Sequence, residues 1–139
     1  MSEKYSIRRL VWAGPLTAAA ALLVNLVFYA ATKALGESYL MTLGGPSKPA
    51  IPMPVLSIVI ATLAGAVGAI LIFAFLLKIS HVPLPPFLSI SVAALLVSFG
   101  GPISLSSATT LQTKLLLCCM HILSAVVIVG GLILLCREK

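Results

Sequence analysis

The sequence predicts an all-α integral membrane protein, a single transmembrane domain folded as a four-helix up-down-up-down bundle with cytoplasmic N- and C-termini. Two observations carry this prediction. The 139 residues are 60% hydrophobic and only 9% charged, whereas soluble domains have about 25% charged residues. The apolar residues also form four continuous runs, each long enough to cross a hydrocarbon core of about 30 Å as a helix.

The four predicted spans have no acidic or basic residue well inside them. They cover about residues 10–31, 54–77, 87–104 and 114–136. Transmembrane β-strands would alternate between apolar and polar residues, and these runs are continuous. The first run is longer than the apolar core of a secretory signal, which has about 7–15 residues. We therefore expect an uncleaved first span.

Basic residues predict the orientation, because cytoplasmic loops carry more lysine and arginine. With the N-terminus inside, the cytoplasmic side holds six basic residues: Lys4, Arg8, Arg9, Lys78, Arg137 and Lys139. The outer side holds Lys33, Lys48 and Lys114. The net charge of +6 therefore mainly reflects the basic residues that set the orientation of the spans. Nucleic acid is not an expected partner, because the basic residues are scattered without interleaved aromatics.

The predicted connections differ in length. The outer loop 34–53 is long, rich in proline and glycine, and too apolar for a free linker. We expect it to lie over the outer mouth of the bundle; the alternative is a loop packed on lipid headgroups. The other two connections are short, which makes neighbouring helices antiparallel. Ser107 or Thr109 is expected to cap the fourth helix.

Small residues recur at helical spacing and predict seams where helix backbones approach closely. The predicted packing positions are Ala61, Gly65, Gly68, Gly101 and Gly131. On this interpretation Gly65→Leu should force helices apart and destabilise the protein far more than Leu71→Ala. The alternative is a polar path or ligand cavity along the bundle axis.

Polar side chains are predicted to converge in the outer half of the bundle, below the long loop. At about 1.5 Å per residue, Asn25 and His121 lie at nearly the same depth, and Ser98 and Thr62 approach it. The candidate ligand or polar-layer residues are His121, Asn25, Ser98, Thr62 and Tyr29. We expect His121 to hydrogen-bond across the bundle, with Asn25 the favoured partner and Ser98 next. That bond would stabilise the fold. The alternative is that His121 binds a ligand, transfers a proton or binds a metal ion.

Cofactor and catalytic chemistry are not expected. Cys118 and His121 share a helix face and could contribute to a metal site, but tetrahedral zinc needs two further ligands, so we predict none. The only acids, Glu3, Glu37 and Glu138, lie outside the spans. Intramembrane acid–base catalysis would rest on His121 alone. These features favour a non-enzymatic protein, with an intramembrane enzyme as the weaker alternative.

Two stretches resemble a known group of proteins. LLVNLVFYA in the first span and MHILSAVVIVGGLILL in the last are similar to small bacterial four-span membrane proteins grouped as a domain of unknown function. The matching positions are Asn25, Met120 and His121. The resemblance implies the fold and no activity, and the proline-rich loop departs from the compact outer loop expected of the group.

The predicted function is that of an accessory or oligomerising four-helix subunit of the bacterial inner membrane, packing through its small-residue seams. Its partners would be the lipid bilayer and a second copy or a larger membrane protein. The alternative is a small channel or carrier for a neutral or lipid-like molecule, with its site in the outer-half polar layer around Asn25, Ser98 and His121.

Overall fold

The computed structural model describes residues 5–42, 49–106 and 109–138. These residues form four spans that are long and apolar enough to cross a membrane: Ile7–Ala34, Val55–Ile79, Leu84–Ser104 and Leu111–Cys136. The predicted all-α fold with four transmembrane-capable helices is confirmed. The helices are α1 (Ile7–Ala34), α2 (Val55–Ile79), α3 (Leu84–Ser98), α4 (Gly100–Ser104) and α5 (Leu111–Cys136), with two short strands, β1 (Leu40–Met41) and β2 (Ile51–Pro52).

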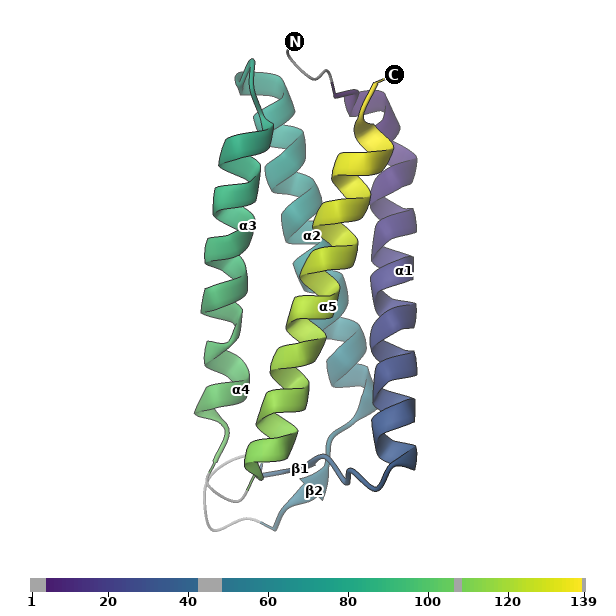
Figure 1. Cartoon of the computed structure of the whole chain (residues 1–139), viewed down its shortest axis with the longest axis vertical. Coiled ribbons are helices and arrows are strands. Elements are labelled where there is room, and N and C mark those ends of the chain that lie inside the picture. Colours follow the sequence, from purple (N-terminus) through teal and green to yellow (C-terminus); the bar gives the residue numbers. More distant parts are fainter. Residues whose placement is uncertain (1–4, 43–48, 107–108, 139) are drawn as a thin grey trace.

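Both chain termini lie at one end of the bundle, and the β1–β2 hairpin lies at the other (Figure 1). These are called the terminal end and the hairpin end below. The backbone N–H of Ser6 donates to the carbonyl oxygen of Cys136 at 2.9 Å. The Arg9 guanidinium donates to the carbonyl oxygen of Arg137 at 2.6 Å. These bonds hold the start of α1 against the end of α5.

The helix α1 packs most extensively against α5 and α2. Its close contacts depend on two glycines. A Cβ atom on Gly131 would collide with the Thr17 side chain, and one on Gly14 would approach the Ile70 side chain to 2.9 Å. Gly131 is therefore a packing position, as predicted, whereas Gly14 is one that the sequence did not reveal.

The third span is broken, although the sequence predicted one continuous helix over 87–104. α3 ends at Ser98, Phe99 lies between the helices, and α4 begins at Gly100. The cause is local, because Pro102 has no N–H to donate to the carbonyl of Ser98 and its ring crowds that carbonyl. The break divides the span into a long segment and a single turn.

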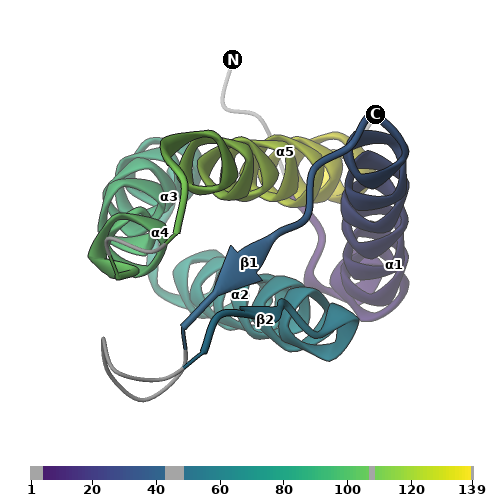
Figure 2. The same cartoon turned by 90° about the horizontal axis from the view of Figure 1, so that it is seen from below.

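The hairpin lies across the open end of the bundle (Figure 2). In it β1 pairs with β2 in antiparallel register, with Leu40 opposite Pro52. Its anchor is Tyr39, which is fully buried with its ring 4.8 Å from that of Tyr29 and its hydroxyl 2.6 Å from Thr32 Oγ1. Tyr39 has φ +48°, a left-handed conformation uncommon outside glycine.

The N-cap of α5 differs from the prediction. Thr110 is the cap, and its hydroxyl oxygen accepts the Thr113 N–H at 3.1 Å. Thr109 is buried one residue earlier. Ser107 lies outside the described residues.

Candidate functional site: a cavity inside the bundle

A cavity of about 510 Å³ lies between α2, the α3–α4 span and α5. α1 contributes only Asn25 to its wall, and the hairpin segment contributes Met41 and Met53. Most of the remaining wall is aliphatic. Ligand pockets have volumes of about 300–1,000 Å³ and mainly apolar walls with a few polar groups. The cavity therefore has the size and composition of a small-molecule site.

Missing side chains create this space. A Cβ atom on Gly65, Gly68 or Gly101 would meet no atom within 4 Å, and all three glycines line the cavity together with Ala61. The prediction that these positions form close helix seams is wrong for the three glycines. Only Gly131, of the four predicted glycines, lies at a tight contact. Small residues usually permit close packing of helices, but at these three positions they leave a hollow.

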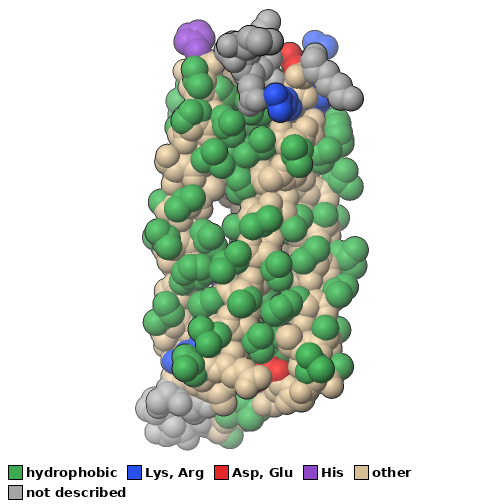
Figure 3. All heavy atoms as spheres, viewed as in Figure 1, with side chains coloured by type: hydrophobic (Ala, Val, Ile, Leu, Met, Phe, Trp, Pro, Cys, Tyr) green, Lys and Arg blue, Asp and Glu red, His purple; other side chains and the backbone are tan. Residues whose placement is uncertain are grey.

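The α3–α4 span leaves one side of the cavity loosely covered. Among its residues only Phe87 and Pro102 are buried. Figure 3 shows a gap in the atomic surface between α3 and α5, about midway along the bundle. The gap lies on the side of the bundle and not at either of its ends.

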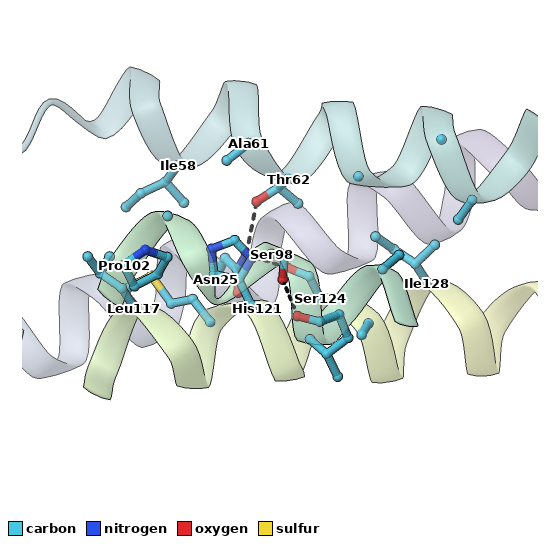
Figure 4. Close-up of a pocket in the computed structure, with 18 of the residues that line it drawn as sticks. Asn25, Ile58, Ala61, Thr62, Ser98, Pro102, Leu117, His121, Ser124 and Ile128 are labelled. Carbon is cyan, nitrogen blue, oxygen red and sulfur yellow. Dashed lines mark hydrogen bonds between the residues drawn. The ribbon is translucent and has the colours of Figure 1, made fainter. Parts of the chain in front are cut away.

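Asn25 is the centre of the polar part of the wall (Figure 4). Its side chain is 3% exposed, and its amide nitrogen donates to Thr62 Oγ1 at 2.9 Å and to Ser124 Oγ at 2.7 Å. Its Oδ1 atom is buried and has no partner among the described residues. Reversing the amide would instead leave two N–H donors unpaired, so one polar end of Asn25 is unpaired in either orientation.

His121 lines the cavity beside this group but does not bond to it. Its ring lies edge-on to Phe99, with centroids 6.5 Å apart. Within the described residues it forms no hydrogen bond, and the Ser98 hydroxyl donates to the carbonyl oxygen of Leu95. The predicted pairing of His121 with Asn25 or Ser98 is therefore wrong. The donor and the acceptor of the imidazole stay available to a molecule in the cavity.

Four of the five predicted polar-layer residues line the cavity: Asn25, Thr62, Ser98 and His121. The fifth, Tyr29, is not part of its wall. It packs against Tyr39, with Lys33 Nζ 5.6 Å from its ring centroid, and so supports the hairpin. Ser124 was missed as a site residue, although its position three residues after His121 places it on the same helix face.

The described wall of the cavity contains no lysine, arginine, aspartate or glutamate. Charged groups gather instead at the ends of the bundle. Glu37 accepts the Tyr39 N–H at 3.0 Å and the Thr113 hydroxyl at 2.8 Å, and Lys114 donates to the carbonyl oxygen of Leu105. An ionised ligand would be unpaired at high cost in such a wall, so the site suits a neutral molecule.

Metal ligands do not gather in the part of the chain that the structure describes. No group of three or more His, Cys, Asp or Glu residues lies together there. Cys118, the weak metal candidate, is absent from the cavity wall that holds His121.

The comparison with protein families covers nearly the whole chain. A family model matches residues 5–135, and its description is a family of unknown function (DUF6069). The chain belongs to this family. The match covers the first three spans, the fourth up to residue 135, and every residue of the cavity wall. Searches among curated proteins and among solved structures found no match.

Proposed function

We propose that this DUF6069 protein binds a neutral, lipid-like molecule in the cavity between α2, α3–α4 and α5, as a binding or carrier protein of the bacterial inner membrane. The observation that carries the proposal is an apolar cavity of about 510 Å³ with His121 at its wall, because the imidazole of His121 forms no hydrogen bond within the described residues. Ion or water conduction would need a wall with more polar groups than this one has.

One energetic term favours an occupied cavity, because an empty apolar cavity costs about 24 cal/mol per Å³ in lost contacts. A molecule with an apolar body removes this term, and one polar group on it can bond to the imidazole of His121 at the wall. The sideways gap between α3 and α5 gives such a molecule a direct path from the bilayer.

The accessory or oligomerising role receives less support from the structure. That prediction depended on small-residue seams, and Gly65, Gly68 and Gly101 border the cavity instead. Association with a second copy or a larger membrane protein stays a prediction.

The orientation supports a site in the outer half of the membrane. Arg8, Arg9, Lys78 and Arg137 lie in the described part of the terminal end, and Lys33 and Lys114 lie toward the hairpin end. The positive-inside bias favours a cytoplasmic terminal end. Asn25 is nine residues from the end of α1 at Ala34, so the polar wall lies nearer the outer surface.

Native mass spectrometry of the protein extracted with its membrane lipids tests the proposal. The wild type should retain one small lipid-like molecule per chain. Gly65→Leu should lose it, because the added side chain occupies the cavity. Leu71→Phe is the matched control, since Leu71 on the same helix is 64% exposed, and it should keep the molecule. Equal retention by the two variants would contradict the proposal.

A further inference from the structure

We propose that α4 is a gate over the hairpin end of the cavity. It turns on Gly100 and Gly101, and hydrogen bonds made by Lys114 and Ser106 hold it closed. The gate gives the site a route toward the hairpin end, in addition to the gap on the side of the bundle. This inference rests on the proposed function and names a way in which the bound molecule exchanges.

The α4 turn is a small and lightly packed part of the cavity wall. It contributes Gly101 and Pro102, and Leu105, which follows α4 directly, also lines the cavity. Among the residues of α4 only Pro102 is buried, while Ile103 is 65% exposed. Because one proline ring is its buried contact, α4 can leave the wall with little loss of apolar burial.

The hinge lies at the break in the third span. α3 ends at Ser98 and α4 begins at Gly100. Pro102 has no N–H to donate to the carbonyl of Ser98, so a helix hydrogen bond across the break is missing. A Cβ atom on Gly100 or Gly101 would meet no atom within 4 Å, and glycine adopts a wide range of backbone conformations. Hinges are a few residues at the ends of elements that absorb such backbone changes.

The rest of the wall is fixed more firmly than α4. Asn25 of α1 donates to Thr62 of α2 at 2.9 Å and to Ser124 of α5 at 2.7 Å, which joins three helices at one level. Toward the terminal end the rings of Phe73 in α2 and Phe87 in α3 are fully buried, with centroids 4.4 Å apart. This contact holds α3 against α2, so the movable part of the third span is α4.

Hydrogen bonds at the hairpin end hold α4 in its closed position. Lys114 Nζ of α5 donates to the carbonyl oxygen of Leu105 at 2.7 Å and to that of Ile103 at 3.5 Å. The hydroxyl groups of Ser106 and Thr42 are hydrogen-bonded to each other, which ties the segment after α4 to the segment after β1. Carbonyl groups at a helix C-terminus have no partner within the helix, and water can replace the lysine when these bonds break.

Labelling of a cysteine inside the cavity tests the gate without a bound ligand. The variant is Ala61→Cys, in a background whose three native cysteines are replaced by alanine, because Ala61 lines the cavity from α2. Delipidated protein in phosphatidylcholine nanodiscs is treated with a charged maleimide, which enters hydrocarbon only at high cost. We expect slow labelling at position 61 and none of the control Leu71→Cys, whose position is 64% exposed on the outside of α2.

Variants of the closing bonds should change the rate of labelling at position 61. Lys114→Met should raise it about fivefold, the ratio expected for one net hydrogen bond, whereas Lys114→Arg keeps a donor and should leave it unchanged. A disulfide between Thr42→Cys and Ser106→Cys should stop the labelling, and its reduction should restore it. If Lys114→Met does not fold, the comparison of the oxidised and reduced disulfide decides.

The outcomes separate the two proposals. An equal rate at position 61 with the disulfide formed or reduced, or a rate unchanged by a folded Lys114→Met, overturns the gate and leaves lipid binding intact. Equal retention of the lipid-like molecule by Gly65→Leu and Leu71→Phe overturns the proposed function instead, whatever the rate of labelling.

Discussion

Gly130 and Gly131 are neighbours in α5 with opposite surroundings. A Cβ atom on Gly131 would collide with Thr17 of α1, whereas one on Gly130 would meet nothing within 4 Å. The pair therefore distinguishes a glycine needed for close packing from one that is not. The sequence GG does not distinguish them, because the difference depends on how α5 is rotated against α1.

This difference gives a test of the α1–α5 contact. Gly131→Ala should lower the free energy of unfolding by about 1–3 kcal/mol, the usual cost of overpacking. Gly130→Ala should leave it unchanged or raise it by about 0.5–1 kcal/mol, because alanine favours the helix. Thermal unfolding of both variants in the same detergent measures the difference, and equal stability would contradict the close packing of α1 on α5.

Asn25 and His121 show which site features the sequence could predict. Their shared depth followed from helix rise and span position, and both line one cavity. Their hydrogen bonds could not be predicted in the same way. Thr62 and Ser124 also lie at that depth and bond to the Asn25 amide, so the choice among polar partners depended on helix rotation and rotamers.

At the level of elements, α2 carries glycines whose spacing predicted a seam but which line the cavity. Four apolar runs without internal charge were enough to predict four spans. Small residues, however, suit a tight helix contact and a cavity wall equally well, and only the spacing of α2 from α3 and α5 decides between them. The break at Phe99 was likewise missed, because GGP lies within an otherwise apolar run.

The cavity reverses the predicted effect of Gly65→Leu. The variant should fold with a melting temperature equal to or above that of the wild type, because leucine favours the helix and its side chain enters open space. Thermal unfolding of ligand-free protein in detergent measures this. A loss larger than that of Leu71→Ala would restore the seam interpretation and contradict the cavity.

Tyr39 makes the hairpin sensitive to alkaline pH. Burial raises its pKa above the usual value, while the hydrogen bond with Thr32 lowers it by a smaller amount. An unfolded tyrosine ionises near pH 10. The contribution of Tyr39 to stability is thus complete below about pH 10 and is lost as the pH rises through its higher folded pKa.

An ultraviolet titration of tyrosine ionisation measures this shift. The wild-type curve minus that of Tyr39→Phe should show a single group with a midpoint above pH 10. A midpoint at or below that of a solvent-exposed tyrosine would mean that Tyr39 is solvated and does not anchor the hairpin over the bundle.

For the whole molecule, a site in the outer half of the membrane requires the hairpin end to face outward. Single cysteines at Ala50 and Ser80, in a background with the three native cysteines replaced by alanine, report the orientation. An impermeant thiol reagent applied to intact cells should label position 50 and leave position 80 unlabelled. The reverse pattern would place the polar wall in the cytoplasmic half of the membrane.

A structure of the protein in nanodiscs made from its native lipids would show whether the cavity holds a lipid-like molecule. We expect elongated density between α2, α3 and α5, with its polar end within hydrogen-bonding distance of His121 and its chain beside Gly65 and Gly68. A bundle in which α3 has closed against α2 and α5, with the space filled by side chains, would contradict lipid binding at this site.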